Sequence, residues 1–242
     1  MNEQHIASAF DRDLEEIQGH IMRMGGLAEA AILDASKSLK NRDEELADKV
    51  RKADSAIDDL EELINQESAR LIALRAPAAG DLRIILSVIK IAGNLERIGD
   101  YAKNMAKRTG VLVHMTQVEG AHGALRRMAR EVQLMLKDAL DAFIQRDVEL
   151  AEEILERDRD IDQMYNALFR EFLTFMMEDP RFITPCMHLH FIAKNTERMG
   201  DHVTAIAEQV IYLVTGAMPD EARVKADITS KDKSLSLNVA EE

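Results

Sequence analysis

The chain has 242 residues, which is enough to bury a sizeable core in one large domain or two small ones. Aromatic residues make up only 4% and Trp is absent, a composition typical of long packed helices and not of a sheet protein. The formal net charge of -13 argues against a protein that binds nucleic acid, and it favours cations or basic partner surfaces.

The compartment is constrained by three further features. A single cysteine, Cys186, excludes an internal disulfide and fits a reducing environment. The segment Met1 to His5 carries neither a basic patch nor an apolar run, so no signal peptide is expected. No run of about 18 apolar residues occurs, so no membrane insertion is expected. We therefore expect a cytoplasmic protein.

The first half of the chain shows three helical stripes, because apolar residues recur at spacings of three and four. Breaks are predicted at Asn41-Arg42-Asp43 and from Ala76 to Gly80, with Asp81 as the cap of the third helix, which ends near Gly110. The apolar residues of the three stripes are Phe10, Leu14, Ile17, Ile21, Met24, Ala28, Ala31, Ala35 and Leu39; Leu46, Val50, Ala53, Ile57, Leu60, Ile64, Leu71 and Leu74; and Ile85, Val88, Ala92, Leu95, Gly99, Ala102 and Met105.

The second half repeats this plan. Gln145-Arg146-Asp147 corresponds to Asn41-Arg42-Asp43, and Glu178-Asp179-Pro180 stops a helix before Thr184, which is predicted to cap the next one. The prediction is an all-α protein made of two tandem antiparallel three-helix bundles, six helices in total. The predicted boundaries are 1–110 for the first repeat, 111–122 for the connector, 123–215 for the second repeat and 216–242 for a flexible tail.

One short motif occurs in the third helix of each half. Asn94-Leu95-Glu96-Arg97-Ile98-Gly99-Asp100 is matched by Asn195-Thr196-Glu197-Arg198-Met199-Gly200-Asp201. The motif retains a Glu and an Asp four residues apart, which lie on the same side of a helix. The repeated feature is therefore a pair of carboxylates.

Each half contains a second acidic pair on its middle helix. Both pairs directly follow residues of the apolar seam, so neighbouring helices can bring four carboxylates together. Such carboxylates would repel one another unless a cation lay among them, and hard oxygen ligands suit Mg, Mn, Ca or Fe. The predicted metal ligands are Asp54, Asp58, Glu96 and Asp100 in the first half, and Asp158, Asp162, Glu197 and Asp201 in the second.

An alternative explanation remains open for these acids. Arg97 and Arg198 could neutralise them in surface ion pairs, which contribute little to stability. Gly99 and Gly200 favour a more specific arrangement, because a glycine inside a helix costs about 1 kcal/mol relative to Ala. Their presence at matching positions suggests the close approach of a helix or a ligand.

No catalytic residues are predicted, since phosphate loops, nucleophile elbows and cysteine-pair zinc sites are all missing from the sequence. His202, next to Asp201, is interpreted as a polar surface residue and not as a ligand. No nest of backbone donors and no Arg cluster indicates a phosphate pocket. A metal-dependent enzyme or iron-storage protein remains the alternative from another functional class.

The two motifs, in this order on tandem three-helix halves, resemble the PhoU family, the accessory proteins of the phosphate-specific transport system. The resemblance runs from about Ile6 to Thr215. It implies a non-enzymatic cytoplasmic regulator that represses the phosphate-starvation response. It also implies a homodimer that links the ATPase of the phosphate ABC transporter to a sensor histidine kinase and modulates phosphate uptake. Regulation of a different phosphate carrier is a further alternative. Because no phosphate pocket is predicted, phosphate status is expected to arrive through the transporter.

The resemblance also implies multinuclear metal binding by an acid-x-x-x-Asp pattern on two helices of each half, which here falls on the eight acids named above. The family often continues the motif with an Asn and then an acid. The first half has Asn104 but Lys107, and the second has Ala205 but Glu208. The two sites are therefore expected to differ in affinity or in metal.

Overall fold

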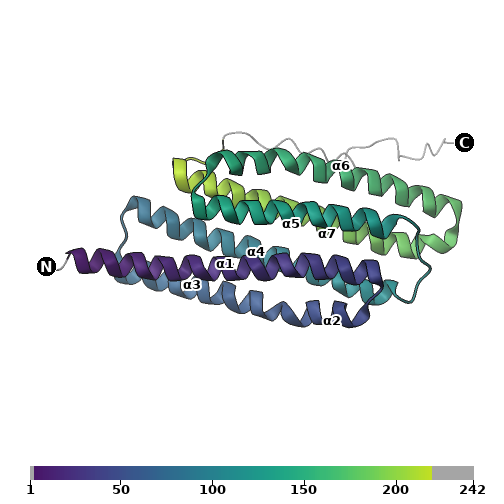
Figure 1. The fold of residues 1–242 in the computed structure, drawn as a ribbon, viewed down its shortest axis with the longest axis horizontal. Helices are drawn as coiled ribbons and strands as arrows, with labels where there is room; N and C mark the ends of the chain where they lie inside the picture. Colours follow the sequence, from purple (N-terminus) through teal and green to yellow (C-terminus); the bar gives the residue numbers. More distant parts are fainter. Residues whose placement is uncertain (1–2, 220–242) are drawn as a thin grey trace, which may run out of the picture.

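A computed structural model describes residues 3–219 as helices joined by short connections, without a strand in that range (Figure 1). The predicted all-α class is confirmed. Residues 220–242 of the predicted tail lie outside the described part of the chain. The elements are α1 (Glu3–Asn41), α2 (Glu44–Ala53), α3 (Ser55–Arg75), α4 (Ala79–Leu112), α5 (Ala121–Gln145), α6 (Val148–Glu178), the 3-10 turn η1 (Pro180–Phe182) and α7 (Ile183–Thr215).

The first turn of each half is built in the same way. Arg42 and Arg146 adopt left-handed conformations, with φ of 55° and 56°, and end α1 and α5. Asp43 and Asp147 then accept hydrogen bonds from Leu46 N at 2.9 Å and from Leu150 N at 3.0 Å. These carboxylates cap α2 and α6, because a side-chain oxygen satisfies an amide that has no helical partner. The internal repeat is therefore present in backbone geometry as well as in sequence.

The middle rod of the first half is interrupted at Asp54. The backbone of Asp54 stays helical, with φ of -58° and ψ of -36°. The helices α2 and α3 therefore continue one another along nearly one axis, and we call such a continuous helical segment a rod. Its carbonyl accepts hydrogen bonds from both Ile57 N and Asp58 N, at 2.8 and 3.2 Å. Counted as rods, the helices of residues 3–219 number six, as predicted. In the second half α6 is continuous, so the interruption belongs to the first acidic pair alone.

Two predicted caps are wrong. The third helix of the first half begins at Ala79, with Ala78 at the cap position, so Asp81 lies within its first turn. The last helix begins at Ile183 and places Thr184 inside its first turn. The observed cap positions, Ala78 and Phe182, lie three and two residues before the predicted ones. An acid in the first turn still interacts favourably with the helix dipole. The third helix also ends slightly later than predicted, at Leu112.

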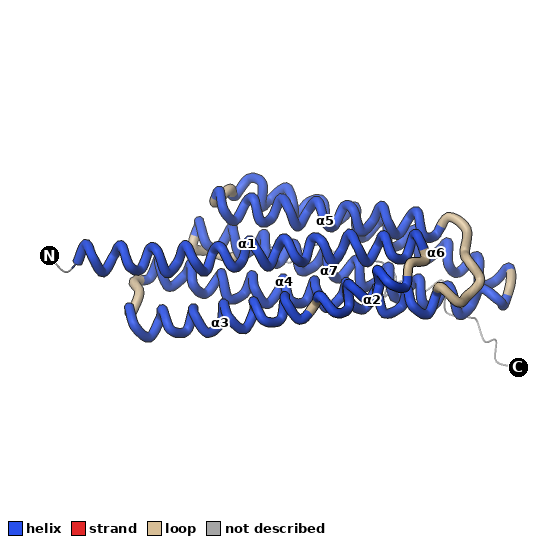
Figure 2. The backbone as a smooth tube through the Cα atoms, turned by 60° about the horizontal axis from the view of Figure 1, so that its bottom comes forward, coloured by secondary structure: helices blue, strands red, loops and turns tan. Residues whose placement is uncertain are grey.

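The two bundles share one continuous hydrophobic core. The first helices of the halves, α1 and α5, pack against each other, as do the third helices, α4 and α7 (Figures 1 and 2). At the α1–α5 contact, a β-carbon on Gly25 would overlap the Leu140 side chain, so glycine permits the close approach. Gln133 of α5 also donates a hydrogen bond to Glu29 of α1, at 2.6 Å.

The connector between the halves is attached to the turn after α1. The Arg42 guanidinium donates hydrogen bonds to the carbonyl oxygens of Val113 and Met115, at 2.5 and 2.9 Å. These bonds hold the start of the connector against the first half. Within the described residues, no helix is long and apolar enough to span a membrane.

Candidate functional site: two acidic faces

The first acidic face lies where α3 crosses α4. Asp54 and Asp58 come from α3 and its junction with α2, and Glu96 and Asp100 come from α4. A β-carbon on Gly99 would lie 3.3 Å from Asp54 Oδ1 and 2.9 Å from Ile57 Cδ1. Glycine at position 99 therefore lets the buried Asp54 carboxylate approach the α4 backbone, between Glu96 and Asp100. The sequence-based inference of a close approach at this glycine is confirmed.

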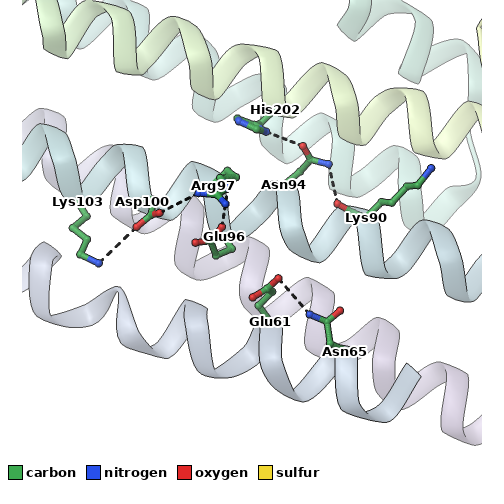
Figure 3. A network of polar contacts seen from close by, with 9 residues as sticks. All are labelled: Glu61, Asn65, Lys90, Asn94, Glu96, Arg97, Asp100, Lys103 and His202. Carbon is green, nitrogen blue, oxygen red and sulfur yellow. Dashed lines mark hydrogen bonds and ion pairs between the residues drawn. The ribbon is translucent and has the colours of Figure 1, made fainter. Parts of the chain in front are cut away.

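Lys103 supplies the main counter-charge of this face. Its Nζ lies 2.5 Å from Asp54 Oδ2. The same Nζ lies 3.6 Å from Asp100 Oδ1 (Figure 3). The hydrogen bond from Lys103 to Asp54 raises the pKa of the lysine. Asp54 is only 4% exposed, and a buried acid is tolerated in a fold only when a partner such as the Lys103 ammonium lies beside it. Lys103 lies three residues beyond the repeated motif and was not singled out from the sequence.

The carboxylates of the first face are close enough to perturb one another. Burial, the Asp100 charge and a hydrogen bond with Asp100 raise the pKa of Glu96 to about 7, opposed by Arg97. Burial and the Asp54 charge raise the pKa of Asp58, opposed by Lys103. The Asp100 charge also contributes at Asp58, so all four predicted ligands of this half belong to one electrostatic cluster.

A fifth acid from α3 joins this cluster. The Glu61 side chain lies across from Glu96 and adds to the rise in its pKa (Figure 3). Glu61 also accepts a hydrogen bond from Asn65 at 3.3 Å. It was missed in the sequence because it lies outside the repeated spacing, although it follows the seam residue Leu60 by one position.

The surface ion pairs that were the alternative explanation do occur in the first half, but they neutralise its acids only in part. Arg97 Nε lies 3.4 Å from Glu96 and Arg97 Nη1 lies 3.7 Å from Asp100, with the arginine side chain 60% exposed. In the second half, the Arg198 guanidinium lies over the Tyr101 ring at 6.0 Å. One exposed arginine cannot offset the crowding of the first face, since the pKa of Glu96 remains raised.

The second acidic face is more deeply buried. Asp158 and Asp162 lie on α6 and Glu197 lies on α7, and all three are 3% exposed or less. Asp201, also on α7, is partly exposed. A β-carbon on Gly200 would lie 3.2 Å from Asp158 Oδ1, which reproduces the relation between Gly99 and Asp54. The close approach of an aspartate to a helix glycine is therefore a feature of both repeats.

The lysines differ between the faces. In the second half, Lys194 contacts Glu197 at 2.8 Å, and its Nζ lies 4.8 Å from the centre of the Tyr165 ring. The position that corresponds to Lys103 is Thr204, and the position that corresponds to Lys194 is Gly93. Each face thus has its own lysine at a different place along the helix. This supports the expectation that the two faces differ in cation affinity.

The residues present are of the types that bind a hard divalent cation, but the described carboxylates of neither face bring three ligand atoms within 4.8 Å of one another. Each face offers carboxylate oxygens from two helices, with a glycine that leaves room for one of them, and the crowding of like charge in the first face favours a bound cation. A bound Mg, Mn or Fe ion would be held by Asp54, Asp58, Glu96 and Asp100, or by Asp158, Asp162, Glu197 and Asp201. Metal binding by these eight residues remains a prediction.

His202 connects the two halves beside this site. Its Nδ1 lies 2.8 Å from Asn94 Oδ1 (Figure 3). Its ring centre lies 5.6 Å from that of Tyr101. Both contacts join α7 to α4. Its interpretation as a polar non-ligand side chain fits this geometry, although it lies between helices and not on the open surface.

A separate cluster of basic side chains was missed in the sequence. Lys37 and Lys40 on α1 line a hollow of about 980 Å³ together with Arg126, Arg127 and Arg130 on α5. The inference that no Arg cluster exists is therefore wrong. Three of these residues lie close together in the sequence, but the set is completed only by packing α1 against α5.

Comparison with known proteins agrees with the architecture. The PhoU domain matches residues 21–109 and again 125–210, one copy in each half. The phosphate-specific transport system accessory protein PhoU homolog of Rhizobium meliloti is 46% identical over 230 residues, which cover 95% of this chain and 97% of the relative. The homolog of Caulobacter vibrioides strain NA1000 is 41% identical, with 94% of this chain and 99% of the relative covered.

Two solved structures share the fold. The crystal structure of PhoU from Pseudomonas aeruginosa has a TM-score of 0.83 at 40% identity and covers 86% of this chain and 100% of its own. PhoU from Streptococcus pneumoniae, described as a phosphate transport system regulatory protein, has a TM-score of 0.81 at 31% identity, with 88% and 100% covered. With both domain copies, full-length relatives and the fold in agreement, the chain belongs to the PhoU family.

Proposed function

We propose that this protein is a cytoplasmic negative regulator of the phosphate-starvation response. In this role it couples the phosphate ABC transporter to a sensor histidine kinase and modulates phosphate uptake. The observation that carries the proposal is 46% identity, along nearly the full length of both chains, to a protein named as an accessory of the phosphate-specific transport system. The relatives' names as accessory or regulatory proteins support a function without catalysis.

The acidic faces suggest how such a regulator would work. A cation bound between α3 and α4, or between α6 and α7, would neutralise carboxylates contributed by two helices and fix the crossing of those helices. The fixed surface would then be presented to the ATPase of the transporter and to the kinase. Basic surfaces on those partners would complement a chain with a net charge of -13. A homodimer would present two copies of these faces.

The first test is the output of the starvation response in cells that lack this chain. Alkaline phosphatase should be high in phosphate-replete cells without the protein and should return to the repressed level when the wild-type chain is restored. Low phosphatase in the deletion strain would overturn the repressor role. Control of transport alone, or of a different phosphate carrier, would then become the better explanation.

The predicted metal ligands of the acidic faces can be tested with purified protein. Asp100→Ala combined with Asp201→Ala should lower bound divalent metal while helical content is retained. A matched control is Asp48→Ala combined with Asp141→Ala, which removes two acids whose only described ion pairs are short-range surface contacts. Unchanged metal content in the first variant would reject the assigned ligands.

A metal-dependent enzyme or iron-storage protein is the alternative that the acidic faces alone would permit. It requires an open coordination position and a nearby general base. Purified metal-loaded protein should therefore show no turnover of phosphate esters or of peroxide. Turnover that disappears in the Asp100→Ala and Asp201→Ala variant would favour the enzyme.

A further inference from the structure

A group of three possible metal-ligating side chains lies at the other end of the first bundle, away from the acidic faces. Glu16 and His20 lie four residues apart on α1, so they occupy the same side of the helix. Glu67 lies on α3, which packs beside α1 (Figures 1 and 2). One ligand atom from each of the three side chains lies within 4.8 Å of the other two. Glu67 is 13 residues after Asp54, or about 20 Å further along the helix.

The central atoms of this cluster are shielded from solvent. His20 Nε2 and Glu67 Oε2 lie 3.4 Å apart, within ion-pair distance for a protonated imidazole, on side chains that are 21% and 28% exposed. The two atoms themselves are buried, and neither has a hydrogen-bond partner in the described chain. Buried polar atoms of this kind are costly unless something satisfies them. A metal ion between them would bind the nitrogen lone pair and the carboxylate at the same time, and Glu16 would supply a third ligand.

Space for a fourth ligand adjoins the cluster. A small cavity of about 50 Å³ is lined by Glu16 and Glu67, together with Asp13 and Arg70. This volume is enough to hold a water molecule. Three protein ligands with one water is a common arrangement for four-coordinate zinc.

We propose that Glu16, His20 and Glu67 bind a Zn²⁺-type transition-metal ion that links α1 to α3. The imidazole distinguishes this site from the two acidic faces, because nitrogen ligands favour borderline ions and all-carboxylate sites favour hard ones. The ion would connect the first two rods of the first bundle at the end opposite the turn that joins them. Because the ion would link two helices, its expected effect is on stability, and the proposal does not depend on the proposed regulatory function.

The test uses the full-length protein, stripped of metal by a chelator and then given excess Mg²⁺ to occupy the carboxylate faces. Zn²⁺ is titrated by calorimetry, and Co²⁺ is used as a visible-absorption probe of nitrogen coordination. Wild-type protein should bind Zn²⁺ at this site, and His20→Gln and Glu67→Gln should each weaken that binding at least about tenfold. The metal-free variants should keep wild-type helical content by circular dichroism.

His114→Gln is the matched control. His114 also pairs with a glutamate, Glu44, at 3.8 Å, but the described residues place no third ligand beside that pair. Zn²⁺ binding that is unchanged in His20→Gln, or lowered equally by His114→Gln, would overturn the site. Should Glu67→Gln unfold the chain, His20→Gln together with Glu16→Gln decides the question alone.

An independent observation concerns the basic groove, defined by Lys37, Lys40, Arg126, Arg127 and Arg130. Within the described chain, none of these five cations forms a salt bridge. They surround a hollow of about 980 Å³ in a protein with a net charge of -13, and they outnumber the acids that also line it. Unpaired cations concentrated in one concave surface of an acidic protein indicate an anion site.

We infer that the basic groove binds a multivalent phosphate anion. The guanidinium fork binds phosphate oxygens in pairs, and the volume exceeds what a single phosphate needs. Inorganic tripolyphosphate is the probe, titrated at fixed ionic strength. Arg126→Ala with Arg130→Ala should weaken binding at least about tenfold, whereas Arg51→Ala with Lys52→Ala, an equal loss of charge on α2, should not.

Any of three results would reject the basic groove as a phosphate site. The first is no tripolyphosphate binding by wild-type protein, and the second is equal weakening in both double variants. The third is equally tight binding of a polyglutamate peptide of the same charge, which would show recognition of general negative charge and not of phosphate.

Discussion

Gly99 of α4 lies so close to Asp54 that a β-carbon at position 99 would be 3.3 Å from the carboxylate oxygen Oδ1. Gly200 and Asp158 repeat this relation at 3.2 Å in the second half. In each bundle, the glycine of the repeated motif thus sets the distance between the helices that carry the acids. The cost of a glycine inside a helix is offset by the approach that it allows.

Gly99→Ala should therefore stabilise the protein less than an alanine at a matched open position. Gly93, on the same helix, has open space where a β-carbon would stand, with no neighbouring atom within 4 Å, so Gly93→Ala should gain up to about 1 kcal/mol from helix propensity. At position 99 the same gain is opposed by contacts at 2.9 Å with Ile57 and 3.3 Å with Asp54. Urea unfolding of the two variants gives the comparison. A greater gain for Gly99→Ala than for Gly93→Ala would contradict this role of the glycine.

Lys103→Met should destabilise the metal-free protein and strengthen cation binding at the first face. Loss of the ammonium leaves the buried Asp54 without its main counter-charge, at a cost of about 1 to 3 kcal/mol. Divalent metal should then recover more stability in the variant than in the wild type. Thermal unfolding with and without Mg²⁺ measures both effects. Lys107→Met, at an exposed position on the same helix, is the control and should change neither.

The stability of the metal-free protein should fall as pH rises through the folded-state pKa of Glu96, about 7. Because this pKa lies above the unfolded value, the folded state binds more protons between the two values, and raising the pH removes that advantage. Burial together with Asp100 and Glu61 opposes ionisation, and Arg97 only partly offsets them. The raised pKa of Asp58 contributes in the same direction.

Glu96→Gln tests this pH dependence. It should raise the melting temperature relative to wild type at pH values above 7, with a smaller difference at lower pH, in the presence of a chelator. The control is Glu62→Gln, since Glu62 is an exposed acid on α3 that accepts a hydrogen bond from Gln66. An equal melting-temperature shift for Glu96→Gln at low and high pH would show that Glu96 ionisation is not the cause.

The aspartate caps offer a test of the internal repeat. Asp43→Ala and Asp147→Ala should each lower the free energy of unfolding by about 1 kcal/mol, because each leaves the amide of Leu46 or Leu150 without its acceptor. Asp48→Ala removes an exposed acid in the same helix as the first cap and should cost less. Denaturant unfolding provides the values. A markedly smaller loss of unfolding free energy in one variant would show that the two caps, although alike in geometry, do not stabilise the protein equally.

The sequence by itself determined the helical class, the six rods and the positions of most turns. Apolar spacing of three and four sets a buried stripe on each helix, and Arg42-Asp43 and Arg146-Asp147 carry turn and cap signals that act within a few residues. The repeated motif also identified Gly99 and Gly200 as points of close approach. Helix starts were less certain, because Asp81 and Thr184 fit equally well inside a first turn.

Only the tertiary structure decided which side chains share a site. Lys103 reaches Asp54 from 49 positions away in the chain, and Glu67 meets His20 across α1 and α3. The basic groove forms from residues on α1 and α5 whose separation in sequence conceals their proximity. Local spacing fixes the face of a helix on which a residue lies. The choice of facing helix, and therefore of counter-charge and ligand partners, depends on packing between segments that are distant in the sequence.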